Sequence, residues 1–150
     1  GLGRILAIDR NPSPRILRFN SDGSLDTSFT ADVGDFGPLS DVCILPDGKV
    51  VIAAYNTSFI SPGQMSSRIV RLNPDGSLDS TFDSGSPLTG RAIKLVRQGD
   101  GKILVGWNET PWITRLLPDG TAEDRFDDPD RRTPLPSTSR GRSPVALTLH

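Results

Sequence analysis

Short apolar runs separated by Asp-Gly or similar turn sequences recur along the chain. Val50–Tyr55 is wholly apolar, and Ile103–Trp107 is interrupted only by a glycine. A strand with one face in water alternates apolar and polar positions, so a continuous run predicts that both faces of its sheet are covered. No window has apolar residues at helical spacing without a Gly or Pro that interrupts it. We therefore predict an all-β chain of short strands.

Two motifs recur three times each and divide the chain into repeats. Arg15–Phe29 and Arg68–Phe82 share 10 of 15 positions, and Trp112–Phe126 shares 7 of 15 with the second of these. The other motif occupies Gly1–Ile8, Pro46–Ala53 and Gly99–Gly106. This periodicity is typical of a repeat architecture. We predict one β-repeat domain over residues 1–150, with repeats at approximately 1–45, 46–98 and 99–150.

Each repeat contains four strand-like segments, which we name A to D. They are Leu39–Leu45, Ala92–Arg97 and Val145–Leu149 (A); Arg4–Ile8, Lys49–Tyr55 and Lys102–Trp107 (B); Arg15–Asn20, Arg68–Asn73 and Trp112–Leu117 (C); and Leu25–Phe29, Leu78–Phe82 and Ala122–Phe126 (D). Sequential antiparallel hairpins of these segments predict a four-stranded meander in each repeat.

Asp-Gly pairs stand in the A–B and C–D connections, as a tight hairpin with two residues at positive φ requires. The predicted structural turn residues are Asp22, Gly23, Asp47, Gly48, Asp75, Gly76, Asp100, Gly101, Asp119 and Gly120. We expect positive φ at Gly48, Gly76 and Gly101. The order of ligands that a calcium loop needs is missing, so turn chemistry is the preferred interpretation of these acids.

The composition narrows the function classes. The chain is 35% hydrophobic, enough for a core, and its net charge of -1 provides no field to attract nucleic acid. One Cys and one His exclude an internal disulfide and a Cys/His zinc site. No apolar run approaches the length of about 20 residues that a membrane span needs. We predict no metal, no cofactor, no nucleic-acid partner and no membrane span.

Stacked four-stranded sheets would cover both faces of the B segments. Such sheets, arranged around an axis, are the blades of a β-propeller. The predicted fold is therefore all-β, with three four-stranded antiparallel blades that form an incomplete propeller. A β-trefoil is the alternative, because trefoil modules also carry four strands.

The pairs PDGKVVIA with RIVRLNPDGSLDSTF, and GDGKILVG with WITRLLPDGTAEDRF, resemble the delta-60 repeat of bacterial β-propeller proteins and, more loosely, NHL-type blades. The resemblance covers Gly1 to Phe126 and the last A segment. It implies large secreted or cell-surface proteins without assigned catalysis, hence an extracellular location. The third copy departs from the pattern, since Leu117 replaces the Asn and Glu123-Asp124 replace the Leu-Asp pair.

The order of segments is B-C-D-A three times, and three blades are too few to close a propeller of 4 to 8 blades. We therefore expect the chain to be a fragment of a longer repeat protein, or to complete a ring by association. The expected partners are further blades of the parent chain or a second copy. Val145–Leu149 and Arg4–Ile8, as A and B segments without partners, are expected to pair within or between molecules.

Candidate catalytic residues are few. Nucleophilic catalysis of the Ser-His-Asp type has only His150 to offer, and Cys43 lies in an apolar run as a small hydrophobe. Asp26 and Asp79 follow the C–D turn at matched places, where bonds to local backbone amides account for them. We predict that the chain is not an enzyme.

The B–C and D–A connections vary in length, whereas the Asp-Gly turns do not, and variable loops on a rigid frame commonly bind ligands. The candidate binding face consists of Tyr55, Asn56, Met65, Trp107, Asn108, Trp112, Arg131 and Arg132. For the tryptophans and Tyr55, packing between blades is the competing interpretation, and for the arginines a solvated loop over Asp127–Ser143. The predicted function is a scaffold or a module that binds a protein or carbohydrate. The alternatives are a glycan-binding trefoil lectin and part of a metal-dependent lactonase-type propeller hydrolase.

Overall fold

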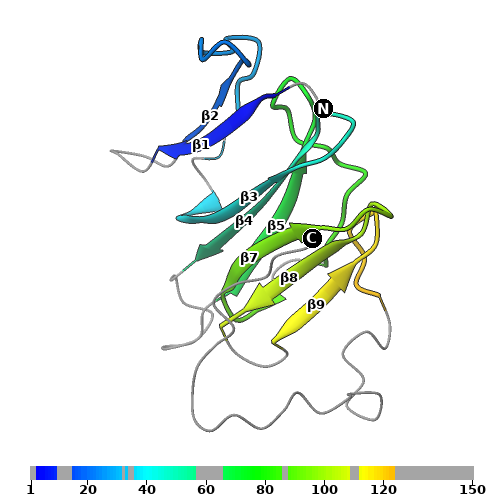
Figure 1. Ribbon diagram of the computed structural model, residues 1–150. Coiled ribbons are helices and arrows are strands. Elements are labelled where there is room, and N and C mark those ends of the chain that lie inside the picture. The colour runs from blue at the N-terminus through cyan, green and yellow to red at the C-terminus, as the bar shows by residue number, and fades with distance from the viewer. Residues whose placement is uncertain are drawn as a thin grey trace, which may run out of the picture.

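The computed structural model describes residues 3–9, 15–31, 33, 36–56, 66–85, 88–108 and 112–123. This part of the chain contains nine β-strands and no α-helix (Figure 1). The strands are β1 (Ile5–Asp9), β2 (Arg15–Phe19), β3 (Leu39–Ile44), β4 (Val50–Asn56), β5 (Ser66–Leu72), β6 (Leu88–Thr89), β7 (Ala92–Arg97), β8 (Ile103–Trp107) and β9 (Ile113–Leu116). The predicted segment Val145–Leu149 lies outside the described residues, as do His150 and the stretch Asp127–Ser143.

The strands form three antiparallel sheets. Strands β3 and β7 lie at the ends of the first and second predicted repeats, and each is the first strand of the sheet that follows. The sheet orders are β1-β2, β3-β4-β5-β6 and β7-β8-β9. Within each sheet, strands that are consecutive in sequence pair with each other, for example Ile52 of β4 with Val42 of β3 and with Val70 of β5. The predicted A, B and C segments that lie within the described residues therefore form the strands of these sheets, and the all-β prediction is confirmed.

Strand β4 is buried on both of its faces. Val51 and Ala53 point into a core shared with the third sheet, where they are clustered with Ile103, Val105 and Trp107. The alternate residues Val50, Ile52 and Ala54 point into a second core, shared with the first sheet. The continuous apolar run exists because sheets cover both sides of this strand, as its sequence predicts.

The three sheets are stacked face to face in an open arc in the described part of the chain (Figure 1). Their first strands come together, since β3 lies beside β7. One Asp41 oxygen accepts a hydrogen bond from the backbone N–H of Leu95 at 2.8 Å and lies 3.1 Å from the Lys94 ammonium nitrogen. This arrangement favours propeller blades over the β-trefoil alternative.

The predicted D strands of the first two repeats are wrong. Leu25 and Leu78 each make a single bridge, to Phe19 and Leu72, and the chain then turns. The turn forms because the following acid, Asp79 in the second repeat, accepts bonds from the backbone N–H and hydroxyl of Thr81 at 3.0 and 2.6 Å. The second sheet obtains its fourth strand from β6, farther along the chain, where Ser67 pairs with Leu88. In the third repeat, Ala122 bridges Leu116, and the rest of the predicted segment is outside the described residues.

The Asp-Gly turns have the predicted positive φ at glycine, with 84° at Gly48, 96° at Gly76 and 85° at Gly101. The predicted loop with two residues at positive φ is wrong, because the loops contain three residues. The N–H of Gly48 donates to the carbonyl of Leu45, and the N–H of Leu45 donates to the carbonyl of Lys49. These bonds enclose Pro46, Asp47 and Gly48 as the loop residues. Pro46 is the first loop residue, and its ring fixes φ near −65°. Only the glycine therefore needs a left-handed backbone.

The acids of all five Asp-Gly turns accept a hydrogen bond from the backbone N–H two residues ahead. The donors are Ser24, Lys49, Ser77, Lys102 and Thr121, at 2.9 to 3.2 Å. This is the local bonding that makes Asp favourable in turns. Each of the five acids therefore bonds within its own turn.

Candidate functional site

An ion-pair cluster at the Asp-Gly end of the second repeat contains three charged side chains. Asp79 is 5% exposed and lies where the chain leaves the C–D turn. Its Oδ2 accepts a hydrogen bond from Arg71 Nε at 2.7 Å and one from Lys49 Nζ at 2.8 Å. Its Oδ1 is occupied by Thr81. Both carboxylate oxygens are thus satisfied by protein groups.

The other two repeats contain the same cluster. In the first, Asp26 Oδ2 accepts a bond from Arg18 Nε at 2.8 Å, and Arg4 Nε lies at 3.9 Å. In the third, Glu123 pairs with Lys102 at 2.8 Å and also with Arg115. Each cluster therefore draws its arginine from the C segment, its acid from the residue after the C–D bridge, and its second cation from the start of the B segment.

These contacts keep the acids ionised. The Lys49 ammonium, the Thr81 hydroxyl and the Arg71 guanidinium hold the pKa of Asp79 far below its ordinary value. The pKa of Asp26 is lowered by the Ser28 hydroxyl and by Arg18, and that of Glu123 by Lys102 and Arg115. A general acid or base must have a pKa near the working pH. These carboxylates are therefore suited to ion pairing and poorly suited to proton transfer.

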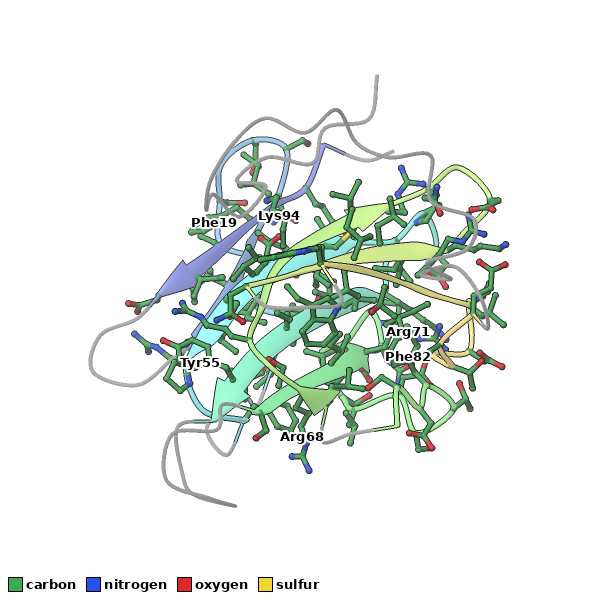
Figure 2. The ribbon with its side chains drawn as sticks, turned by 90° about the horizontal axis from the view of Figure 1, so that it is seen from below. Phe19, Tyr55, Arg68, Arg71, Phe82 and Lys94 are labelled. Carbon is green, nitrogen blue, oxygen red and sulfur yellow. The ribbon has the colours of Figure 1, made fainter. Side chains whose placement is uncertain are left out.

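The arginines of these clusters also join one repeat to the next. Arg18 Nη1 donates to the carbonyl of Pro74 at 2.6 Å, and Arg71 Nη1 donates to the carbonyl of Pro118. Each guanidinium stacks on a phenylalanine of its own repeat, Arg18 on Phe29 at 4.5 Å and Arg71 on Phe82 at 4.8 Å. Figure 2 shows Arg71 beside Phe82 at one end of the molecule and Tyr55 toward the other. Planar, multidentate binding of this kind requires arginine.

Backbone hydrogen bonds support the same junctions. The N–H of Thr30 donates to the carbonyl of Asp75 at 2.9 Å, and that of Asp83 donates to the carbonyl of Asp119 at 2.8 Å. In both cases, the end of one repeat's D segment bonds to the C–D turn of the following repeat. The Asp-Gly turns therefore connect repeats as well as strands.

Sequence reasoning predicted the bonds of Asp26 and Asp79 to local amides but missed their ion pairs. The signal is present in the sequence, since an arginine stands eight positions before the acid in all three copies. The sequence predicts that Glu123-Asp124 of the third copy replaces the Leu-Asp pair of the other copies. This alignment is wrong by one position. The bridge of Leu116 to Ala122 aligns Ala122-Glu123 with that pair. The third repeat therefore keeps its acid.

A second cluster of polar residues lies at the end opposite the Asp-Gly turns. The Arg91 guanidinium lies 4.1 Å from the centre of the Tyr55 ring. The Arg91 backbone N–H donates to Asn108 Oδ1 at 2.9 Å, and the Asn108 N–H donates to the Arg91 carbonyl at 3.0 Å. The structure thus brings together Tyr55 and Asn108 of the predicted binding face, through an arginine that the prediction did not include.

The remaining residues of the predicted face are dispersed. Trp107 is 4% exposed, belongs to the core between the second and third sheets and donates from Nε1 to Thr114 Oγ1 at 2.9 Å. Packing between blades therefore accounts for it. Trp112 is 39% exposed, and Asn56 is the last residue of β4. Met65, Arg131 and Arg132 lie outside the described residues.

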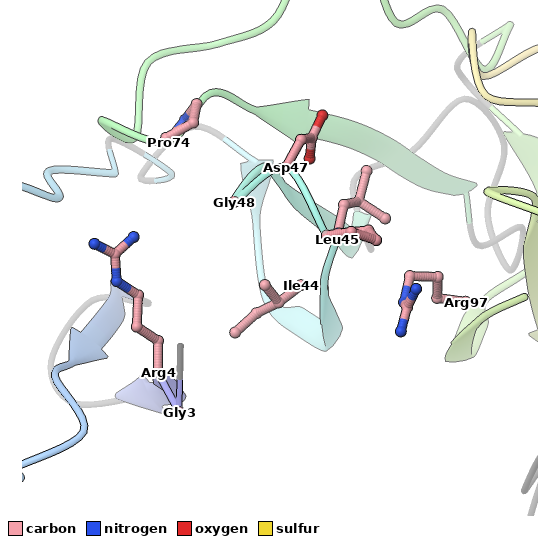
Figure 3. A pocket seen from close by; sticks show the side chains of 9 residues that line it. Gly3, Arg4, Ile44, Leu45, Asp47, Gly48, Pro74 and Arg97 are labelled. Atoms are coloured by element: carbon pink, nitrogen blue, oxygen red, sulfur yellow. The ribbon is translucent and has the colours of Figure 1, made fainter. Parts of the chain in front are cut away.

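A hollow of about 660 Å³ opens at the Asp-Gly end (Figure 3). It is lined by Gly3, Arg4, Ile44, Leu45, Pro46, Asp47, Gly48, Pro74 and Arg97. The lining includes residues from all three sheets or their turns, and it combines apolar side chains with two guanidinium groups. Sequence reasoning placed binding at the other end, because the turns here are short and uniform. The hollow forms between repeats, and a comparison of loop lengths within repeats cannot reveal it.

The described residues contain no group of three or more His, Cys, Asp or Glu side chains placed to hold a metal ion. In the same part of the chain, no helix is long and apolar enough to cross a membrane. Cys43 is half-buried, and burial raises the pKa of its thiol.

Residues 3–29 and 45–82 match the model of a family described as a β-propeller domain of unknown function, DUF5122. The matched ranges contain the B, C and D segments of the first two repeats, with their Asp-Gly turns and their ion-pair clusters. No curated protein matches the chain. The chain is therefore similar to a β-propeller family over its first two repeats, in agreement with the stacked sheets.

Proposed function

We propose that this chain is a non-catalytic β-propeller repeat segment that acts as a scaffold and presents a binding surface to a protein or carbohydrate. The ion-pair clusters carry this proposal. Asp26, Asp79 and Glu123 are each bound to cations of their own repeat, and two of the arginines continue into the next repeat. These acids, which a catalytic site could have used, are therefore engaged in ion pairs, and two of them bind the arginines that connect one repeat to the next.

The proposed binding surface is the end that carries Tyr55, Arg91 and Asn108. The Arg91 guanidinium lies over the Tyr55 ring, and Asn108 bonds to both the backbone N–H and the backbone carbonyl of Arg91. The Arg91 Nε atom is buried and has no hydrogen-bond partner among the described residues. Arginine and tyrosine are both enriched at the hot spots of binding interfaces. Location in a secreted or surface bacterial protein is part of the proposal and follows from the delta-60 resemblance.

Binding screens on immobilised glycans and on displayed peptides would test this function. We expect a ligand whose affinity falls at least tenfold in Arg91→Ala and Tyr55→Ala and is unchanged in Arg15→Ala, a substitution on the first sheet. Hydrolysis of lactones in the presence of divalent cations, abolished by Asp79→Asn in folded protein, would contradict the proposal. Equal loss of binding in Arg15→Ala would show that the surface is misplaced.

A further inference from the structure

The hollow at the Asp-Gly end lies between cations that come from different repeats. Arg4 precedes β1 of the first sheet, and Arg97 ends β7 of the third. Figure 3 shows them on opposite sides of Ile44, which ends β3. Two guanidinium groups thus border one hollow without belonging to one ion-pair cluster.

Arg4 is held less firmly than its counterparts in the other repeats. Lys49 and Lys102 each lie 2.8 Å from the acid of their cluster, whereas Arg4 Nε is 3.9 Å from Asp26. Its side chain is also more exposed, at 36%, against 27% for Lys49 and 25% for Lys102. Arg18 already satisfies the buried oxygen of Asp26. Arg4 is therefore available to an additional anionic partner.

Arg97 occupies a strand position of the third sheet that is apolar in the second sheet. It pairs with Ile103 across the third sheet, as Ile44 pairs with Val50 across the second. It is exposed, and the ion pairs of the described residues do not include it. The sheet pairing does not require a cation here, since Ile44 serves in the same place.

The charge around the hollow is unbalanced. Asp47 is the only acid among the lining residues, and its Oδ1 accepts a hydrogen bond from the N–H of Lys49 in the turn. The other side chains of the lining are apolar, from Ile44, Leu45, Pro46 and Pro74, and Figure 3 shows Ile44 and Leu45 between the two arginines. None of the lining residues is aromatic, so a nucleobase or sugar ring would find no stacking partner. The lining thus suits a short carbon chain with negatively charged ends.

We propose that this hollow binds a small organic dicarboxylate, with one carboxylate on Arg4, the other on Arg97 and the carbon chain against the apolar wall. A guanidinium group can donate two parallel N–H···O bonds to a carboxylate, so a carboxylate is favoured here over a simple halide ion. The volume of about 660 Å³ is in the range of small-molecule sites. This site goes beyond the scaffold role and does not depend on the surface around Arg91.

Glutarate is a suitable probe, with butyrate and chloride as controls at matched ionic strength. In ¹⁵N–¹H correlation spectra, we expect glutarate to shift the amides of Gly48 and Arg97 saturably, and to bind at least tenfold more tightly than butyrate. Arg97→Gln should weaken glutarate binding at least tenfold. Arg68→Gln, which removes an exposed cation on β5 beside Ala54 and far from the turns, should leave it unchanged.

Arg4→Gln should weaken binding to a similar extent, and Arg4→Lys should restore part of it. Because Arg4 also faces Asp26, the melting temperature of each variant is measured first, and Arg97→Gln decides the question if Arg4→Gln unfolds. The proposal is overturned if chloride produces the same shifts, or if glutarate binds folded Arg97→Gln as tightly as the parent chain. Shifts spread over both ends of the molecule would also overturn it.

Discussion

The backbone of Gly76 packs against the carbonyl group of Thr30 across the boundary between two repeats. A Cβ atom built on Gly76 would lie 2.3 Å from the Thr30 carbonyl oxygen, much closer than any real contact. Gly120 stands in the same relation to Asp83, with the nearest backbone atoms at 2.9 Å. At Gly23, by contrast, none of the described residues comes within 4 Å of such an atom. Glycine thus has a packing role at the two junctions beyond its role in the turn.

Alanine substitutions separate these two roles. Both Gly76 and Gly23 have positive φ, at 96° and 85°, so both Gly76→Ala and Gly23→Ala lose about 1–2 kcal/mol through the backbone. We expect Gly76→Ala to lose at least about 2 kcal/mol more, because the added methyl group pushes two repeats apart. Urea denaturation would measure both losses. Equal losses would mean that the contact with Thr30 does not exist in solution.

Asp79→Asn should destabilise the fold by about 3 kcal/mol at neutral pH, because Arg71 and Lys49 lose their shared carboxylate. The pKa of Asp79 is lowered on folding from an ordinary value of 3.8, so its contribution is present above about pH 4 and is lost as the pH falls further. The difference between the parent chain and the variant should therefore narrow between pH 7 and pH 3. Urea denaturation at both pH values checks this, and a difference that grows on acidification would contradict it.

Arg18→Lys tests the junction between the first and second repeats. Lysine keeps the charge but cannot pair with Asp26, donate to the Pro74 carbonyl and stack on Phe29 at the same time. We expect a loss of about 1–3 kcal/mol. Arg15→Lys, on the same strand but in an exposed pair with Asp9, should cost less than about 0.5 kcal/mol. Thermal melts of the two variants give the comparison, and a similar small loss in both would argue against the junction.

The stability of the chain should not respond to reductant or chelator. Cys43 is the single cysteine, so reduction has no internal disulfide to break, and the turn acids already bond to backbone amides. Melting temperatures with and without dithiothreitol, and with and without EDTA, measure this. A shift of more than a few degrees with EDTA would indicate that a bound cation contributes to the fold.

The strands could be predicted because their signal is local. The run Val50–Tyr55 and the turn residues around Gly48 fix a strand and its end within a few positions. The D segments misled the prediction because Leu78 begins like a strand, whereas Asp79 turns the chain through the bonds that it accepts from Thr81. The same acid also forms a cluster with Arg71 and Lys49. That cluster depends on residues from three segments, which a reading of one segment at a time does not combine.

The candidate sites depended even more on contacts between repeats. Tyr55 and Asn108 were predicted on the basis of loop position, but Arg91, which joins them, gives no signal of its own in the sequence. From the sequence alone, Trp107 could belong to a binding loop or to the core. In the structure it is buried against the neighbouring sheet and belongs to the core. Arg4 and Arg97 are 93 positions apart, and only the stacking of the sheets makes them border the same hollow.

The junctions between repeats accept hydrogen bonds through the backbone carbonyls of Pro74 and Asp75, and of Pro118 and Asp119. Every residue provides such a carbonyl, so the repeat that accepts these hydrogen bonds needs no particular side chain to do so. A gene segment that encodes one repeat could therefore be duplicated, deleted or exchanged with another, provided that it brings its own arginine, acid and turn glycine. Recombination between repeats would produce arrays of different length from one junction geometry, while the loops at the opposite end are free to diverge.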